Sequence, residues 1–349
     1  MEEKVEDEPN QVTKYFSLVE GISTLKSEIK AANTDAGSGD SSPLEAELSI
    51  LEEQRAALEN IVRKILTQQI KEVLAEQGIF NPVDEYIKAK IGFPPINFRL
   101  EQPPHLLVIS PRDRIESIRE ITLEQNISLG EMENIETEVA KLGVSSLVVK
   151  LGGFAGTYPT FVVNDANLRF TVDAAVEEWL HQYLVFEPLG FLYLLDVTGV
   201  VGNYDIATMN ETVASMVSKE IGAMVYEKYY SQYEGDEKQS QGTESEFDFN
   251  REMRQIRRAV DTYLAQGEIE QAEGFMEEKR QFLASRGYYI RKINQAYFAF
   301  HGTYADKPTS ISPIGLELKQ LRNRSTSLKN FLDTVAALTS RQDLKNRLK

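Results

Sequence analysis

Residues Val176–Leu184 read VEEWLHQYL and contain one of only three histidines in this chain of 349 residues. Read as a helix, the stretch places Glu177 and His181 four positions apart, and therefore on one face. Glu178 lies beside them, about 100° round the helix at 3.6 residues per turn. Two carboxyl groups and an imidazole are thus brought close together, and the interpretation of the whole chain depends on this stretch.

A second motif, NETVA at Asn210–Ala214, opens another predicted helix further along the chain. The pair of motifs resembles that of gluzincin metallopeptidases, a class that includes thermolysin-like and aminopeptidase-type enzymes. In that class H-E-x-x-H on one helix is followed by N-E-x-x-A on a later one. The chain also resembles a little-described bacterial group with the pattern H-E-W-x-H-x-Y-L-x-F-x-P-L-G. It departs from both patterns at the first ligand, where Glu177 replaces histidine.

The resemblance implies a metal site with a catalytic base. Glu177, His181 and Glu211 would hold a zinc ion, and Glu178 would activate a water molecule for attack on a peptide or protein substrate. Two carboxylates and one imidazole make a more anionic ligand set than two imidazoles and one carboxylate. The preference should therefore shift toward harder metals such as Mn²⁺ or Fe²⁺.

The resemblance also implies groups that bind and polarise the substrate. In zincin domains the edge strand before the metal-binding helix pairs with the substrate backbone, and Gly156, Thr157 and Tyr158 lie at the corresponding place. A phenol or an imidazole often polarises the tetrahedral intermediate in gluzincins. The tyrosine-rich predicted helix and its end offer Tyr288, Tyr297, His301 and Tyr304, and Tyr297 and His301 are the preferred candidates. The alternative interpretations are an ordinary hairpin turn for the first segment and a helix C-terminal histidine for the second.

Three interpretations of Glu177 remain open. The first is an active metal-dependent peptidase with an altered ligand. The second is a pseudoenzyme that has lost or weakened its metal and keeps the zincin fold as a peptide- or protein-binding module. The third is a chance match, in which Trp179 and Leu180 form a half-buried stripe beside solvated acids. Stoichiometric metal in the purified protein would distinguish the first from the others.

The amino-acid composition limits the kinds of partner, metal site and membrane association that the chain can have. The net charge of -16 argues against binding to nucleic acid, which requires a basic surface. The absence of cysteine excludes thiolate metal sites, iron–sulfur clusters and disulfides, so any metal must be held by histidine and carboxylates. No apolar run approaches the roughly 18 residues of a membrane span, and the acidic N-terminus does not resemble a signal peptide. A cytoplasmic protein and the soluble part of a membrane-anchored protein both fit this composition.

The chain is predicted to be a mostly helical α+β protein in three parts. Residues 1–90 form a helical hairpin or coiled-coil arm, with helices over Gln11–Ala32 and Leu44–Gln77. A flexible linker is expected near 33–43. The arm either packs on the main body or mediates self-association. A zincin-like catalytic domain at 91–235 and a helical C-terminal domain at 236–349 complete the chain.

Short strands are expected to form a small mixed sheet before the metal-binding helix, at Phe98–Leu100, His105–Ile109, Val144–Leu151 and Tyr158–Val163. Other predicted features of this part are a helix at Pro111–Ile121, a capped helix at Ser128–Leu142 and a turn at Pro188–Gly190. An acidic loop is predicted at Glu234–Asp248. Helices are then predicted over Phe249–Gln266, Glu268–Arg286, Gly287–Gly302 and Gly315–Thr339.

Overall fold

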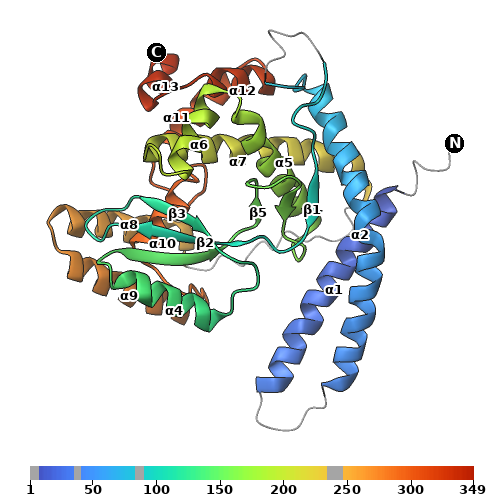
Figure 1. The fold of residues 1–349 in the computed structure, drawn as a ribbon, viewed down its shortest axis with the longest axis horizontal. Coiled ribbons are helices and arrows are strands. Elements are labelled where there is room, and N and C mark those ends of the chain that lie inside the picture. The colour runs from blue at the N-terminus through green and yellow to red at the C-terminus, as the bar shows by residue number, and fades with distance from the viewer. Residues whose placement is uncertain (1–7, 35–40, 83–89, 234–246) are drawn as a thin grey trace.

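The computed structural model describes residues 8–34, 41–82, 90–233 and 247–349 (Figure 1). These residues are mostly helical and include two small three-stranded sheets, which confirms the predicted α+β class. Most of the predicted linker near 33–43 and of the predicted loop at Glu234–Asp248 lies outside them. None of the described helices combines the length and the apolar character that a membrane crossing requires.

The first sheet leads directly into the helix that carries the VEEWLHQYL stretch. Its strands β1 (Phe98–Leu100), β5 (Gly153–Phe154) and β6 (Thr160–Val162) have the order β1-β6-β5. β1 pairs with β6 in parallel and β5 pairs with β6 antiparallel, so the sheet is mixed and β5 is an edge strand. After β6 the chain enters α5 (Leu168–Leu184).

The sequence of α5 explains its length and its position. The side chain of Asn167 accepts a hydrogen bond from the Phe170 N–H and so caps the N-terminus. Buried apolar side chains recur at helical spacing along one side, as at Val172, Val176 and Leu180. This side packs against α7 (Tyr204–Tyr230), whose buried residues belong to the same core. Polar groups of α5 also face α7, since Nδ1 of His181 lies 2.9 Å from Oδ1 of Asn210.

The second sheet lies between two helices, α4 (Leu129–Ala140) and α10 (Gln295–Gly302). Its strands β2 (His105–Ser110), β3 (Arg119–Thr122) and β4 (Ser145–Lys150) are antiparallel, with β2 in the centre. Alternate residues face opposite sides. Leu107 and Val148 pack with Met132 of α4, whereas Val108, Leu147 and Val149 pack with Ala296 of α10. The predicted capping box of α4, between Ser128 and Glu131, is present.

Three predicted helices and one predicted turn need correction. The segment Pro111–Ile121 is not a helix, because its end belongs to β3 and pairs with β2, with Ile109 opposite Arg119. Pro188–Gly190 is not a turn but the start of α6 (Pro188–Val197), where proline occupies the first helical positions. The Gly287–Gly302 helix covers only α10, which begins after the capping side chain of Asn294.

The predicted helix Gly315–Thr339 is instead divided between α11 (Pro313–Arg324) and α12 (Leu328–Ala336), and α13 (Arg341–Leu348) follows. Ser327 caps α12 and Ser340 caps α13 through their side chains, so each serine starts a new helix. Together with α7, these helices contribute to the largest apolar core. The helices α8 (Phe249–Ala265) and α9 (Ile269–Ser285) pair with each other, and their apolar side chains form a separate core with Ile293 and with Phe298 of α10.

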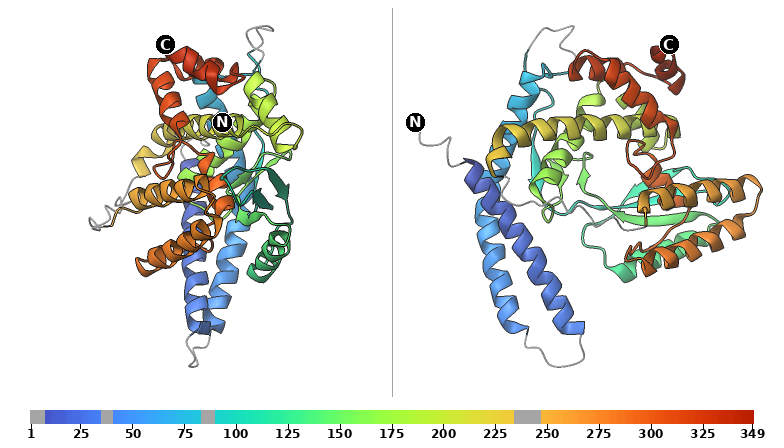
Figure 2. Two further views of the ribbon diagram at one scale, coloured as in Figure 1. Left: turned by 90° about the vertical axis from the view of Figure 1, so that its left-hand side faces the viewer. Right: turned by 180° about the vertical axis from the view of Figure 1, so that it is seen from behind.

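The N-terminal pair, α1 (Glu8–Thr34) and α2 (Ser42–Glu76), forms an antiparallel hairpin that projects from the body (Figures 1 and 2). The apolar stripe of α1 is buried, and Val12, Tyr15 and Val19 belong to the largest core. α1 therefore packs within its own chain, chiefly on α2. That core contains residues from all three predicted domains, whose boundaries remain a prediction.

Replacing Tyr15 by Ala tests this intramolecular packing. Tyr15 is only 1% exposed, and removing a buried aromatic ring should lower the free energy of unfolding by about 3–5 kcal/mol. Urea denaturation should show the same loss at two protein concentrations tenfold apart, since packing within one chain does not depend on concentration. A loss that changes with concentration would instead indicate self-association through the hairpin.

Candidate metal centre

The packing of α5 on α7 brings together the three side chains that the two motifs single out. Glu177, His181 and Glu211 each offer one ligand atom, and these atoms all lie within 4.8 Å of one another. The helices meet through buried apolar residues on both sides of the group, including Val176 of α5 and Val213 of α7. The three side chains could hold a metal ion.

The imidazole of His181 has the orientation of a metal ligand. Its Nδ1 lies 2.9 Å from Oδ1 of Asn210, to which it donates a hydrogen bond. Nε2 then carries the lone pair, and it lies 3.7 Å from Oε2 of Glu211. A partner that holds the second ring nitrogen and so fixes the tautomer is typical of metal-binding histidines. Asn210, the first residue of the NETVA motif, thus orients His181, whose Nε2 faces Glu211, the second residue of the motif.

The carboxylate of Glu211 has one oxygen that a cation could bind. Its Oε1 accepts a hydrogen bond from the Tyr193 hydroxyl of α6. Oε2 is buried and has no hydrogen-bond partner among the described residues, and Glu211 is only 8% exposed. A buried carboxylate oxygen without a partner is costly. A divalent cation at this point would be coordinated by Oε2, and the donor set of oxygens and one nitrogen suits such an ion.

Glu178 lies beside this group and faces a cavity of about 400 Å³, which His181 and Glu211 also line. Its carboxyl accepts a hydrogen bond from the backbone N–H of Ala155, directly after β5. Any side chain at Gly153 would collide with this carboxyl. Glycine at 153 therefore lets the edge strand approach the helix closely enough to orient Glu178.

The predicted substrate-binding segment lies next to this strand, held by α5. Nε2 of Gln182 donates to the carbonyls of Ala155 at 3.1 Å and Thr157 at 2.9 Å. Gly156 lines the cavity. Thr157 and Tyr158 do not line it, and Tyr158 is 55% exposed. One of the three predicted substrate-binding residues, Gly156, therefore lies at the cavity, and the other two do not.

Burial and mutual repulsion raise the pKa values of the carboxyl groups around the cavity. Burial and the charge of Glu211 raise the pKa of Glu177 to about 8, although Lys307 and Lys219 oppose this rise. Burial, followed by the charges of Glu177 and Glu211, raises the pKa of Glu178 well above its usual value. On the opposite wall, burial and Glu211 raise the pKa of Glu120 to about 7. A divalent cation would reverse these shifts, since it favours the charged carboxylates.

Among the described residues, three phenols line the cavity, and that of Tyr204 donates its hydrogen bond to the Ala299 carbonyl. The other two belong to Tyr193 and Tyr304. Tyr193 stacks on His181 with ring centroids 5.6 Å apart, and Tyr304 follows α10. Burial raises the pKa of both phenols well above 10, with the charge of Glu211 as the next cause. Both groups are therefore O–H donors at neutral pH.

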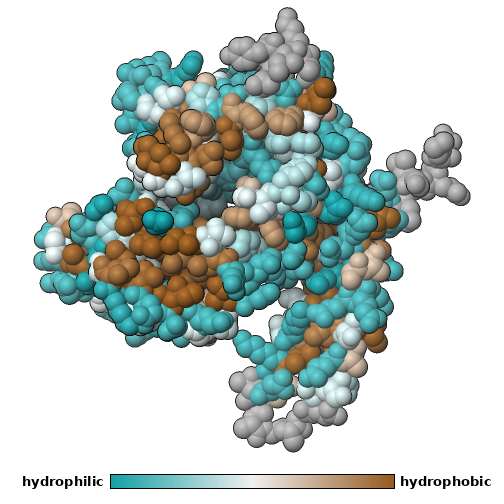
Figure 3. Space-filling view, viewed as in Figure 1, coloured by the Kyte–Doolittle hydropathy of each residue, from teal (hydrophilic) through white to brown (hydrophobic). Residues whose placement is uncertain are grey.

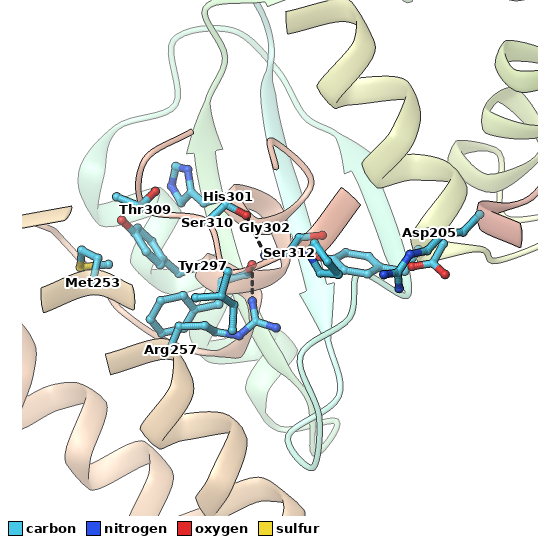
Figure 4. A pocket seen from close by; sticks show the side chains of 14 residues that line it. Asp205, Met253, Arg257, Tyr297, His301, Gly302, Thr309, Ser310 and Ser312 are labelled. Carbon is cyan, nitrogen blue, oxygen red and sulfur yellow. Dashed lines mark hydrogen bonds between the residues drawn. The ribbon is translucent and has the colours of Figure 1, made fainter. Parts of the chain in front are cut away.

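The predicted residues Tyr297 and His301 line a different pocket, with a volume of about 250 Å³. Figure 4 shows their side chains near one another in this pocket, with Asp205 on the opposite side, and their ring centroids are 4.3 Å apart. Burial, together with the charge of Lys307, lowers the pKa of His301 to about 4. Tyr304, just after α10, lines the cavity of the candidate metal centre instead.

Two residues of this cavity, Tyr193 and Glu120, have no role that the sequence pattern predicts. The segment Pro188–Gly190 suggests a turn, so the sequence pattern does not place Tyr193 on a helix near the site. Proline at the start of an apolar stretch also signals a helix N-terminus. Glu120 falls in a segment predicted as a helix, although the β-branched pair Ile121 and Thr122 that follows it is typical of strands. Comparison of the chain with known protein families, curated proteins and solved structures found no match.

The raised pKa of Glu177 predicts how stability depends on pH in the metal-free protein. A carboxyl whose pKa rises from 4.5 to about 8 on folding binds more protons in the folded state between these values. The free energy of unfolding should therefore fall as the pH rises from about 5 to 8. Glu177→Gln removes this contribution and should stabilise the protein at pH 8 by an amount on the order of 2–4 kcal/mol, with little change at pH 5.

Urea denaturation in the presence of a chelator, at pH 5 and pH 8, measures this difference. Glu124→Gln provides the control, because Glu124 is exposed and lies outside the cavity. If Glu177→Gln and the wild type have the same stability at pH 8, Glu177 is ionised without cost and the expected pH dependence is wrong.

Proposed function

We propose that this chain is a metal-dependent peptidase of the gluzincin type with a carboxylate in place of the first histidine. The observation that supports this most strongly is the unpartnered Oε2 of Glu211, which faces Nε2 of His181 at 3.7 Å inside a cavity. An oxygen of Glu177 completes the group within 4.8 Å. A divalent cation held there would supply Lewis-acid chemistry, lowering the pKa of a water and polarising a carbonyl.

The residues of the chain would then carry the proton and orient the substrate. Glu178 takes a proton from the attacking water, whose oxygen forms a bond to the carbonyl carbon of the substrate. The peptide C–N bond breaks, and the same carboxyl delivers the proton to the departing amine. Tyr304 lines the cavity, and its O–H group would donate a hydrogen bond to the carbonyl oxygen as that oxygen becomes negative. The O–H group of Tyr193 donates to Oε1 of Glu211 and so holds that ligand in place. The edge strand β5 and Gly156 would align the substrate backbone.

Zinc is the usual metal of this class, but the ligand set suits harder ions as well. Two carboxylates favour Mn²⁺ or Fe²⁺ more than two imidazoles would. We therefore propose that the site accepts Zn²⁺, Mn²⁺ and Fe²⁺, with a smaller preference for Zn²⁺ than an H-E-x-x-H site has.

One observation favours a second function, a peptide-binding module that uses no metal. The charges of Lys307 and Lys219 act on Glu177 and favour its ionised form. Two lysines, rather than an ion, would then offset the charge at the first ligand position. In that case the cavity would bind peptides without cleaving them.

Metal analysis combined with peptide hydrolysis tests the proposal. The purified chain is loaded separately with Zn²⁺, Mn²⁺ or Fe²⁺, dialysed, and assayed for bound metal and for cleavage of a defined peptide mixture. We expect about one ion per chain in the wild type and none in Glu211→Gln, since that variant loses an anionic ligand. Glu227→Gln, an exposed position on the same helix, should bind metal normally. Absence of stoichiometric metal in the wild type would reject the peptidase and leave the binding module.

A further inference from the structure

The walls of the 400 Å³ cavity combine negative charge with apolar surface. Four carboxyl groups line it, those of Glu120, Glu178, Asp196 and Glu211, and none of its described lining residues is Lys or Arg. Glu178 and Glu211 belong to the candidate metal centre. Glu120 and Asp196 come from other elements, β3 and α6, and have no role in that centre.

Glu120 lies at the edge of the second sheet, where its side chain faces the cavity. It pairs with Val108 of β2, whose side chain packs toward α10. Ser117 Oγ donates a hydrogen bond of 3.1 Å to Glu120 Oε1. In the described part of the chain, no Lys or Arg forms an ion pair with Glu120. A half-buried carboxyl with only a serine as partner leaves capacity for a cationic ligand.

Apolar groups occupy the space around these carboxyls and continue onto the surface. Leu106, Leu151 and Phe300 line the cavity. Outside it, Phe191, Val200 and Val201 of α6 and the following turn are more than half exposed, at 51%, 67% and 52%. Figure 3 shows apolar surface over α6 and over the β2–β3 region, on either side of a hollow. A ligand in this cavity would therefore meet apolar walls, an acidic interior and an apolar rim.

We propose that the cavity selects peptides that carry a lysine or arginine side chain, whose charged end pairs with Glu120, next to apolar residues that contact the α6 rim. This inference rests on the proposed function, because it names the substrate class of the same site. A long basic side chain fits better than a free amino terminus. Its apolar stem can lie along Leu106 and Leu151, while its charged end reaches the carboxyl.

The buried Oε2 of Glu211, which supports the metal centre, faces the same cavity and has no hydrogen-bond partner among the described residues. It indicates that the cavity is built to receive a ligand or ion and does not merely collect acidic groups. Electrostatic complementarity across such a cavity discriminates between charged and neutral partners.

Calorimetric titration with matched peptides tests the proposal. The chain of 349 residues, loaded with Mn²⁺ and carrying Glu178→Gln to prevent cleavage, is titrated with acetyl-Gly-Phe-X-Leu-Phe-Gly-amide, where X is lysine, norleucine or glutamate. A fourth peptide has norleucine at X and a free amino terminus. We expect the lysine peptide to bind at least about tenfold more tightly than the acetylated norleucine peptide, and the glutamate peptide to bind most weakly. The free amino terminus should increase the affinity of the norleucine peptide only slightly.

A second substitution, Glu120→Gln, should reduce the preference for lysine to about twofold or less and leave the affinity for the norleucine peptide unchanged. Glu124→Gln, which is exposed and outside the cavity, should keep the full preference. Equal affinity for lysine and norleucine, absence of binding to any peptide, a preference for the free amino terminus, or a lysine preference that survives Glu120→Gln would each overturn the proposal. Because the readout is binding, selective binding without hydrolysis by the wild type would reject only the peptidase.

Discussion

Replacement of Glu178 by Gln is expected to lower kcat for peptide cleavage by about 10²–10⁴-fold, the usual contribution of a general base. Gln has the same shape and still accepts the hydrogen bond from the Ala155 N–H, so the geometry next to β5 should be kept. The glutamine amide cannot take a proton from water, however. The bound metal should remain at the wild-type level, since Glu178 is not among the three ligands.

Mass spectrometry of a defined peptide mixture measures the rate, and elemental analysis measures the metal. Glu124→Gln is the matched control and should cleave at the wild-type rate, because its side chain is exposed and lies outside the cavity. Cleavage by Glu178→Gln at an undiminished rate would mean that another group is the base or that a contaminating protease acts.

The second large effect is expected for Glu177→His, which completes the H-E-x-x-H pattern. At pH 7 a carboxyl with a pKa of about 8 is mostly protonated, and a metal ion must displace that proton. One pH unit corresponds to roughly a tenfold loss of affinity. A histidine with an ordinary pKa of about 6.5 avoids most of this loss. The variant should therefore bind Zn²⁺ at least about tenfold more tightly than the wild type at pH 7.

The same reasoning predicts that the advantage disappears with rising pH. At pH 9 Glu177 is ionised in both the free and the metal-bound protein, so the affinities for Zn²⁺ should converge. For Mn²⁺ the gain should be smaller throughout, because this ion prefers carboxylate oxygen. Competition titrations against a chelator of known affinity, at pH 7 and pH 9, measure both effects. Equal Zn²⁺ affinity of the two proteins at pH 7 would show that Glu177 is not a ligand.

The elements that depend on local pattern can be predicted from the sequence. The helices α1, α2, α4, α8 and α9 have apolar periodicity and clear ends, and the buried strand β4 is a short apolar run between glycines. The helix α5 also follows from its spacing, so the sequence alone predicts that Glu177, Glu178 and His181 are neighbours. NETVA, near the start of α7, indicates where the third carboxylate comes from.

Features that depend on contacts between distant segments cannot be predicted in this way. Pro188 is compatible with a turn and with a helix start, and this ambiguity hides α6 and Tyr193. The strand β3 is short and mostly exposed, and it forms because it pairs with β2. The sequence pattern therefore does not predict that Glu120 lies at the site. Tyr297 and His301 share a segment with Tyr304, but the turn after α10 takes only Tyr304 to the cavity of the candidate metal centre.

The sequence by itself thus determined the local chemistry, since side chains four residues apart on a helix meet whatever the rest of the chain does. Tertiary packing decided the rest. It placed Glu211 next to His181, left one carboxylate oxygen without a partner among the described residues, and brought Glu120 to the opposite wall. The physical reason is that charge and burial in a site depend on every segment that surrounds it. The raised pKa of Glu177 arises from burial and from Glu211, a residue on another helix.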